Sequence, residues 1–181
     1  RPTSASPPAL HEMSDERAAA GTMVVHAASW RGDRAAIERI RRAVFIEEQG
    51  IPEADEWDDT DPVSRHVLAG ATKRDAVGTG RLEPTGKIGR VAVLPQYRGN
   101  GVGSRIVGHL VNQATVLGLT QVYLHAQTSA VVFYERLGFQ VDGPEFDEVG
   151  IPHRRMRQGI EQLDGYKAGR NGKSEHSVEP G

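Results

Sequence analysis

One segment determines the architecture of this chain: Arg90-Val91-Ala92-Val93-Leu94-Pro95-Gln96-Tyr97-Arg98-Gly99-Asn100-Gly101-Val102-Gly103-Ser104. Its first part is an apolar strand that Pro95 ends, and its last part opens a long helix. Between them, Gly99, Gly101 and Gly103 leave the backbone without Cβ atoms, so a ligand can approach the main chain. The first N–H groups of a helix have no partner within the helix and form its positive dipole end. The segment therefore predicts an anion site that suits a diphosphate group.

Two common phosphate-binding motifs do not fit this segment. A P-loop requires a lysine before its final Ser or Thr, whereas Ser104 directly follows Gly103. A dinucleotide fingerprint counted from Gly99 requires glycine at Ser104 and an acidic residue at the end of the next strand, which ends in Leu124-His125-Ala126. ATP and NAD(P) are therefore disfavoured as ligands. A turn whose glycines serve only close packing is the structural alternative.

Length and composition indicate one folded domain. The chain has 181 residues, of which 38% are hydrophobic, a net charge of −2 and no cysteine. The absence of cysteine excludes a disulfide framework and a cysteine nucleophile and fits a reducing compartment such as the cytoplasm. The charge and the lack of a long apolar run disfavour nucleic acid and membranes as partners, and the histidines show no metal-ligand spacing. We expect a flexible leader at residues 1–22, a folded domain at 23–163 and a disordered tail at 164–181.

Hydrophobic periodicity predicts strands and helices in alternation. Strands are expected at residues 23–27, 66–69, 76–82, 87–94, 121–125 and 139–141, and a last one begins at Pro152. Helices are expected at residues 33–49, with Asp33 as the cap, at 102–117, and from Ser129 to Leu137. The helix between the fourth and fifth strands makes a parallel crossover. The fold class is therefore α/β (α+β), with a mixed sheet of six to seven strands flanked by helices.

The glycine-rich turn resembles the acetyl-CoA signature of the GNAT family of N-acetyltransferases, Arg/Gln-x-x-Gly-x-Gly/Ala. A second segment resembles that family's Ala-x-x-Phe-Tyr-x-x-x-Gly-Phe motif: Ala130-Val131-Val132-Phe133-Tyr134-Glu135-Arg136-Leu137-Gly138-Phe139. Both motifs in the right order are more specific than either alone. Residues 44–49 and 145–153 further resemble the ElaA-like branch of the family. The resemblance covers the whole expected domain and implies the GNAT fold with acetyl-CoA as co-substrate.

The resemblance assigns the acetyl-CoA contacts to residues of the fourth strand, the glycine turn and the second motif. These residues are Val91, Ala92, Val93, Arg98, Gly99, Asn100, Gly101, Val102, Gly103, Ser104, Gln127 and Tyr134. Gln127 stands where many members carry asparagine.

The resemblance also implies direct transfer of the acetyl group to a primary amine in a ternary complex. The N–H of Val93 would stabilise the carbonyl oxygen in the transition state, and Tyr134 would protonate the departing thiolate. Glu48 is the first candidate for the base that deprotonates the ammonium of the acceptor. Glu47, His125 and His153 are further candidates, although His125 is expected to face sheet packing. The alternative for Tyr134 is a place in the core.

The acceptor is expected to be a small-molecule or peptide amine. Between Glu47 and Asp61 the chain carries many carboxylates and no Lys or Arg, so the run either attracts a cation or is a solvated loop. Residues 143–153 are rich in Gly and Pro, and we expect an ordered loop that forms a wall of the acceptor site. Glu47, Glu145 and His153 are the expected acceptor-binding residues.

The sequence leaves open one alternative function and one alternative oligomeric state. A non-catalytic acyl-CoA sensor or partner-binding module on the same fold would bind acetyl-CoA without turnover. Members of the family often pair, so a homodimer is open as well.

Overall fold

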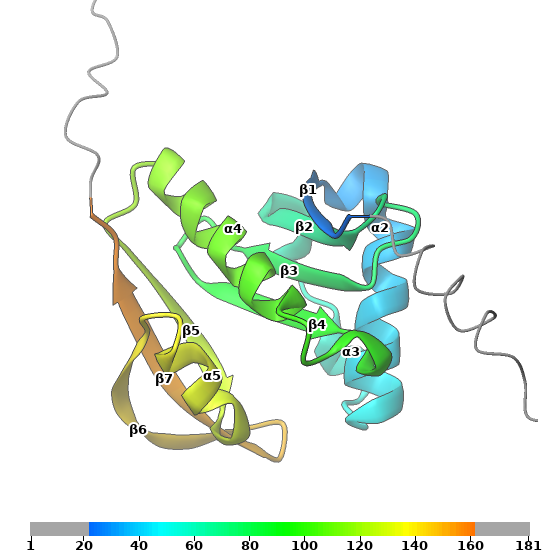
Figure 1. Ribbon diagram of the computed structural model, residues 1–181. Helices are drawn as coiled ribbons and strands as arrows, with labels where there is room; N and C mark the ends of the chain where they lie inside the picture. The colour runs from blue at the N-terminus through cyan, green and yellow to red at the C-terminus, as the bar shows by residue number, and fades with distance from the viewer. Residues whose placement is uncertain (1–21, 162–181) are drawn as a thin grey trace, which may run out of the picture.

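Residues 22–161 are described by a computed structural model of the chain (Figure 1). The expected tail and all but the last residue of the expected leader lie outside the described residues. The strands are β1 Val24–Ala28, β2 Arg65–Gly70, β3 Gly78–Leu82, β4 Ile88–Val93, β5 Gln121–Gln127, β6 Gln140–Glu148 and β7 Ile151–Gly159. The helices are α2 Trp30–Arg41, η1 Arg42–Glu48, α3 Glu53–Glu56, η2 Asp61–Val63, η3 Pro95–Tyr97, α4 Val102–Val116, η4 Thr128–Ala130 and α5 Val131–Glu135. The expected α/β class is confirmed.

The strands form two antiparallel sheets instead of one continuous mixed sheet. Strands β1-β2-β3-β4 make the first sheet in that order, and β5-β7-β6 make the second. The expected parallel pairing of β4 and β5 is reduced to a single bridge between Lys87 and Tyr123. From this bridge the two strands diverge, as Figure 1 shows. The backbone edges of β4 and β5 that face each other therefore stay free for a ligand.

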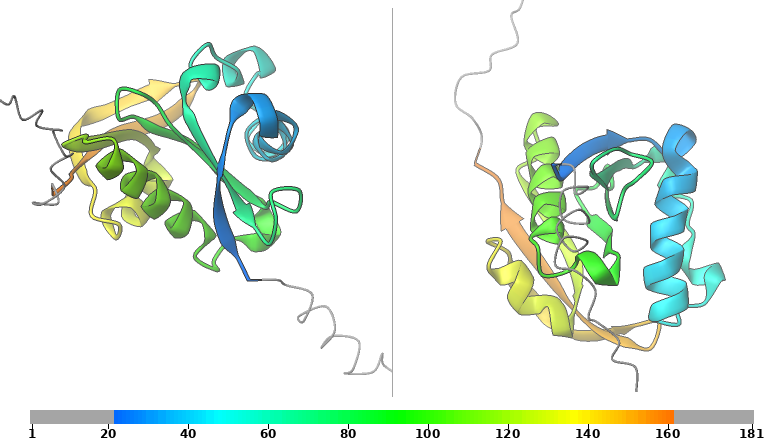
Figure 2. Two further views of the ribbon diagram at one scale, coloured as in Figure 1. Left: turned by 90° about the horizontal axis from the view of Figure 1, so that it is seen from above. Right: turned by 45° about the vertical axis from the view of Figure 1, so that its right-hand side comes forward.

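Helices α4 and α2 cover opposite faces of the four-stranded sheet (Figure 2). The α4 face is held by Ile106 and Leu110, both fully buried, and the α2 face by Ile37 and Ile40. Helix α4 packs directly on the backbone of β3, since a Cβ atom at Gly80 would lie 2.6 Å from Ile106. Within residues 22–161, no helix has both the length and the apolar character that a bilayer span requires.

Helix α2 begins earlier than the sequence suggested. Its N-cap is Ser29, whose Oγ accepts a hydrogen bond from the N–H of Gly32 at 3.1 Å. Asp33 is therefore not the cap; its carboxylate accepts a hydrogen bond from the N–H of the cap residue Ser29 at 2.9 Å. The helix continues without a break into the π-helical segment η1.

The expected loop at residues 143–153 is instead most of a β-hairpin. Strand β6 runs to Glu148 and β7 begins at Ile151. Val149 and Gly150 both have positive φ, 55° and 75°, as a two-residue type I′ turn requires. The turn is closed further by the N–H of Gly150, which donates to Oδ1 of Asp147 at 2.8 Å. The tip of this hairpin reaches below the end of η1 (Figure 2).

Candidate active site

A cavity of about 690 Å³ opens where β4 and β5 diverge. Its walls come from β4, the start of α4, η1, β5, α5 and the β6–β7 hairpin. The cavity collects most of the residues expected from the sequence: Val91, Ala92, Val93, Arg98, Gly99, Gly101, Val102, Gly103, Ser104, Gln127, Tyr134 and His153.

The glycine turn forms an open cradle at the start of α4. Gly99 and the N-cap residue Gly101 have positive φ, 77° and 75°, and a Cβ atom built on either would meet nothing within 4 Å. Gly103 differs, because its Cβ would lie 3.3 Å from the ring of Phe133. Close packing thus explains Gly103, whereas Gly99 and Gly101 leave main-chain N–H groups accessible beside the helix dipole. This cradle fits a diphosphate.

Val93 presents its backbone to the cavity. The N–H of the next residue, Leu94, donates to the carbonyl of Val77 at 2.9 Å, and Val93 lies opposite Gly78. Neighbouring residues of an antiparallel strand alternate between hydrogen-bonded and non-bonded pairs. The N–H of Val93 therefore faces away from β3, toward the open edge of β4. Nε of Arg98 donates to the Val93 carbonyl at 2.9 Å and holds the glycine turn against the strand end.

Tyr134 lies half-buried on α5 at the wall of the cavity. Its ring makes edge contacts with Phe133 and Phe139, at centroid distances of 4.9 and 5.9 Å. Burial raises the pKa of Tyr134 to about 12, so the phenol is protonated throughout the physiological pH range. Within the described part of the chain the hydroxyl has no hydrogen-bond partner. The side chain is thus anchored by its ring and has a free donor.

The end of η1 contacts both sides of the divergence between β4 and β5. The carboxylate of Glu48 accepts two hydrogen bonds from Arg98, at 2.7 and 2.6 Å. The next residue, Gln49, accepts a hydrogen bond at 2.8 Å from Nε2 of Gln127, the last residue of β5. Adjacent residues of one segment therefore hold the turn after β4 and the end of β5. The hydrogen bonds from Arg98 lower the pKa of Glu48.

Two histidines, His125 and His153, line the cavity on the side formed by β5 and the β6–β7 hairpin. Nδ1 of His125 lies 3.1 Å from a carboxylate oxygen of Glu148, and Nδ1 of His153 lies 2.8 Å from the carbonyl of Ile151. Phe146 contacts both rings. Burial lowers the pKa of His125 and the Lys87 ammonium lowers it further, while the hydrogen bond with Glu148 opposes them. His125 is thus neutral at pH 7.

Comparison with known proteins agrees with this geometry. A family profile described as an acetyltransferase (GNAT) domain matches residues 56–159. The chain belongs to the GNAT family. Its co-substrate is accordingly acetyl-CoA.

Relatives place the chain in the ElaA-like branch of the GNAT family. Protein ElaA of Escherichia coli is 34% identical over 136 residues, which are 70% of this chain and 88% of ElaA. YyaT of Bacillus subtilis is 43% identical over 128 residues, 67% of this chain and 86% of YyaT. The crystal structure of E. coli ElaA superposes with a TM-score of 0.68 at 27% identity, covering 76% of this chain and 99% of ElaA. An acyl-CoA N-acyltransferase from Pseudomonas aeruginosa gives 0.67 at 28% identity, with 76% and 99% covered.

Some residues expected in the GNAT site lie outside the cavity. Glu47 is exposed on η1, and Glu48 is engaged by Arg98. Nδ2 of Asn100 donates to the Arg98 carbonyl at 3.2 Å. Glu145 is exposed, because its side chain lies on the face of β6 that points away from the cavity. It accepts a hydrogen bond from the Thr128 hydroxyl at 3.2 Å.

Sequence reasoning missed the inward position of His125 and named Glu145 instead of Glu148 as a residue of the site. His125 does not face sheet packing as expected; it lines the cavity. The signal was available, because alternate residues of a strand share a face and His125 is two residues before the expected ligand Gln127. Glu148 lines the cavity in place of Glu145. Its position depends on the bulge in β6 that shifts the register between Val141 and Glu145, which the sequence does not reveal.

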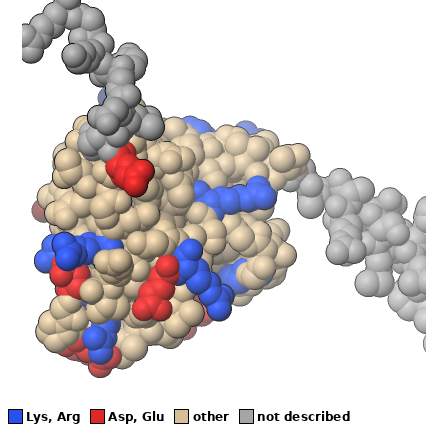
Figure 3. Space-filling model, turned by 60° about the vertical axis from the view of Figure 1, so that its left-hand side comes forward, with Lys and Arg blue, Asp and Glu red and all other residues tan. Residues whose placement is uncertain are grey.

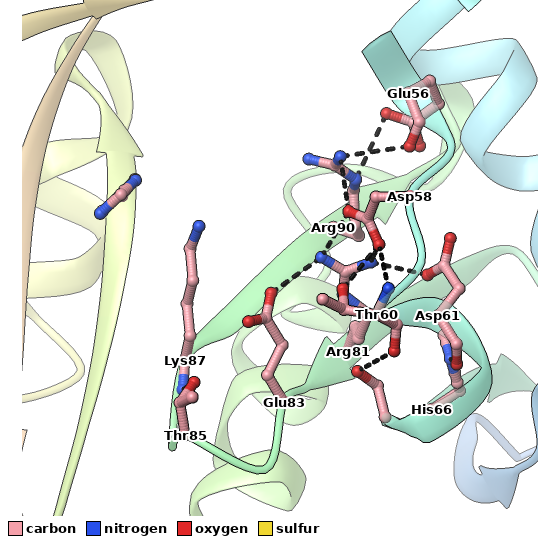
Figure 4. A network of polar contacts seen from close by, with 12 residues as sticks. Glu56, Asp58, Thr60, Asp61, His66, Arg81, Glu83, Thr85, Lys87 and Arg90 are labelled. Carbon is pink, nitrogen blue, oxygen red and sulfur yellow. Dashed lines mark hydrogen bonds and ion pairs between the residues drawn. The ribbon is translucent and has the colours of Figure 1, made fainter. Parts of the chain in front are cut away.

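Three carboxylates of the acidic run, Glu56, Asp58 and Asp61, are paired with arginines of α2 and β3. Arg41 donates to Glu56 at 2.5 Å and to Asp61 at 2.7 Å, and Arg81 donates to Asp58 at 2.8 Å and to Asp61 at 2.7 Å. Figure 4 shows the part of this network around Arg81. The run is thus divided between this internal ion-pair network and exposed carboxylates, which include Glu47, Asp55 and Asp59. On the face shown in Figure 3, basic and acidic side chains are interspersed.

Proposed function

We propose that the chain transfers an acetyl group from acetyl-CoA to a primary amine by direct attack in a ternary complex. One observation carries the proposal: the cradle of α4, the open edge of Val93 and the free hydroxyl of Tyr134 border the same cavity. A cofactor bound by its diphosphate at the cradle can therefore extend its thioester between β4 and β5.

The N–H of Val93 would stabilise the negative charge that develops on the thioester oxygen during attack. A preorganised donor of this kind contributes on the order of 10²–10³-fold to the rate. The orientation of this N–H toward the free edge of β4 supports the assignment, and the bond from Arg98 to the Val93 carbonyl fixes it.

Tyr134 would donate a proton to the departing thiolate. Its hydroxyl is protonated at all relevant pH values, since the pKa of Tyr134 is raised to about 12. Because a buried phenol is a weak acid, the proton moves as the thiolate charge develops in the transition state and not before.

His125 would accept the proton of the attacking amine, directly or through water, with Glu148 orienting its ring. A neutral imidazole has the free lone pair that a base needs, and the pKa of His125 is below its ordinary value. Glu48 is the poorer candidate, because Arg98 occupies its carboxylate and lowers its pKa. We assign Glu48 to the positioning of Arg98.

The test is calorimetry with acetyl-CoA followed by a thiol-release assay over a panel of primary amines. We expect saturable acetyl-CoA binding and amine-dependent release of CoA. Gly101→Val should abolish binding, because a β-branched residue in the left-handed region is strained and fills the cradle. Gly108→Ala, at an open exposed position on α4, is the matched control and should bind normally.

Two outcomes would contradict the proposal. Acetyl-CoA binding without release on any amine would indicate a non-catalytic sensor. Unchanged acetyl-CoA binding by Gly101→Val would show that the glycine turn is not the diphosphate site.

A further inference from the structure

Lys87 is a cation in the cavity that has no ion-pair partner among residues 22–161. It immediately precedes β4, is half-buried and lines the cavity. Among residues 22–161, no carboxylate forms an ion pair with its ammonium. Figure 4 shows its side chain extending on the side of β4 that faces β5, while the neighbouring Glu83 turns to Arg81.

Most other charges that line the cavity are already paired. Arg98 is bound to Glu48, Arg90 contacts Glu56 and Asp58, and Glu148 contacts His125. Of the charged side chains in the described part of the cavity wall, Lys87 and Asp55 alone lack such a partner. The cavity thus offers a free positive charge at Lys87, which suits a ligand that carries a negative charge.

The cofactor does not place an anionic group beside Lys87. Lys87 lies at the opposite end of β4 from the glycine turn, and the 6 residues of β4 span about 20 Å at ~3.3 Å per residue. The thioester arm of acetyl-CoA is uncharged, and its nucleotide and 3′-phosphate lie beyond the diphosphate, on the side away from the thioester. An anion beside Lys87 must therefore come from the acceptor.

Lys87 is also close to the group assigned as base. It forms the parallel bridge with Tyr123, two positions before His125 on β5, and its charge acts on His125. An anion paired with Lys87 would therefore hold the rest of a small molecule against His125 and Glu148. One ammonium matches the single charge of a carboxylate better than the double charge of a phosphate monoester.

We propose that the acceptor is an amino acid whose carboxylate pairs with Lys87 while its amino group faces His125 and Glu148. This inference rests on the proposed acetyl transfer and names the acceptor class for the same site. Lys87 is then a specificity-determining residue for the acceptor and has no part in cofactor binding.

The test compares matched acceptors in the thiol-release assay with the full-length protein. Each amino acid is assayed beside the amine that remains when its carboxylate is removed, and beside the aminoalkyl phosphate of the same length. For the wild type, kcat/KM should be about 10- to 100-fold higher for the amino acid, the range for a charge-assisted pair. Lys87→Met should lose this preference while its Kd for acetyl-CoA, measured by calorimetry, stays unchanged.

Two further variants sharpen the test. Lys73→Met is the matched control, because Lys73 pairs with Asp33 outside the cavity, and it should keep the wild-type preference. Lys87→Glu should shift the preference toward diamines, which a merely structural role of Lys87 would not produce.

The inference is overturned if the wild type uses decarboxylated amines or aminoalkyl phosphates as well as amino acids, or if Lys87→Met retains the preference. Acetyl-CoA binding without CoA release from any amine would instead overturn the proposed acetyl transfer, and the acceptor class with it.

Discussion

At the scale of single residues, Tyr134 combines a packing role with the proposed role of proton donor. Its ring packs between Phe133 and Phe139, while its hydroxyl is available to a ligand. Tyr134→Phe keeps the ring contacts and removes the donor, so kcat should fall about 10²-fold with little change in the Kd for acetyl-CoA. Steady-state kinetics and calorimetry measure the two quantities. Unchanged turnover would show that another group protonates the thiolate.

His125 predicts the pH dependence of the reaction. A base acts in its neutral form, and burial and Lys87 hold the pKa of His125 below its ordinary value. The rate constant kcat/KM should therefore be constant near pH 7 and fall only as the pH drops through that lowered pKa, below about 6.5. His125→Asn should lower kcat about 10²-fold and abolish this acidic limb. His109→Asn, on α4 outside the cavity, should keep it. An identical profile for both variants would contradict the assignment.

A variant of Glu48 tests whether this residue positions Arg98 or acts as the base. Glu48→Gln retains a hydrogen-bond acceptor but loses the charge that holds Arg98 at 2.7 and 2.6 Å. We expect KM for acetyl-CoA to rise about 10-fold, the effect of one charge-assisted hydrogen bond, while kcat stays close to the wild-type value. A loss of kcat by about 10²-fold at saturating acetyl-CoA would instead make Glu48 the base.

At the scale of elements, the contact between α4 and β3 fixes the position of the cradle. A Cβ atom at Gly80 would lie 2.6 Å from Ile106 and 3.0 Å from Leu110. Gly80→Ala should therefore lower the free energy of unfolding by about 1–3 kcal/mol through overpacking. Gly108→Ala, exposed on the same helix, should raise it by about 0.5–1 kcal/mol. Urea unfolding measures both, and equal effects of the two changes would contradict the packing argument.

Local patterns predicted most elements, because strands, the glycine turn and the second motif depend on neighbouring residues. The π-helical geometry of η1 was not predictable, since the periodicity of residues 42–48 is also compatible with an α-helix. The side-chain hydrogen bonds from the end of η1 to Arg98 and Gln127 could not be predicted from the sequence either. Glu48 and Arg98 are 50 residues apart, and Gln49 and Gln127 are 78 apart. Nothing in the local sequence of either partner indicates the other.

At the scale of the whole molecule, buried ion pairs connect the acidic segment at residues 56–61 to α2 and β3. Oδ1 of Asp61 accepts from both Arg41 and Arg81, at 2.7 Å each. Asp61→Asn leaves buried arginine charge uncompensated and should lower the free energy of unfolding by about 3–5 kcal/mol. Asp59→Asn, at an exposed position in the same run, should have little effect. Chemical unfolding measures both, and a small effect at Asp61 would show that the network adds little to stability.

The fold and the cradle support one central claim: main-chain N–H groups between Gly99 and Gly103 bind the diphosphate of acetyl-CoA. A crystal structure of the complex with acetyl-CoA tests this claim most directly. The account predicts diphosphate oxygens at about 2.7–3.2 Å from these nitrogens, with the thioester between β4 and β5. A cofactor bound elsewhere, with the start of α4 free of phosphate, would contradict it.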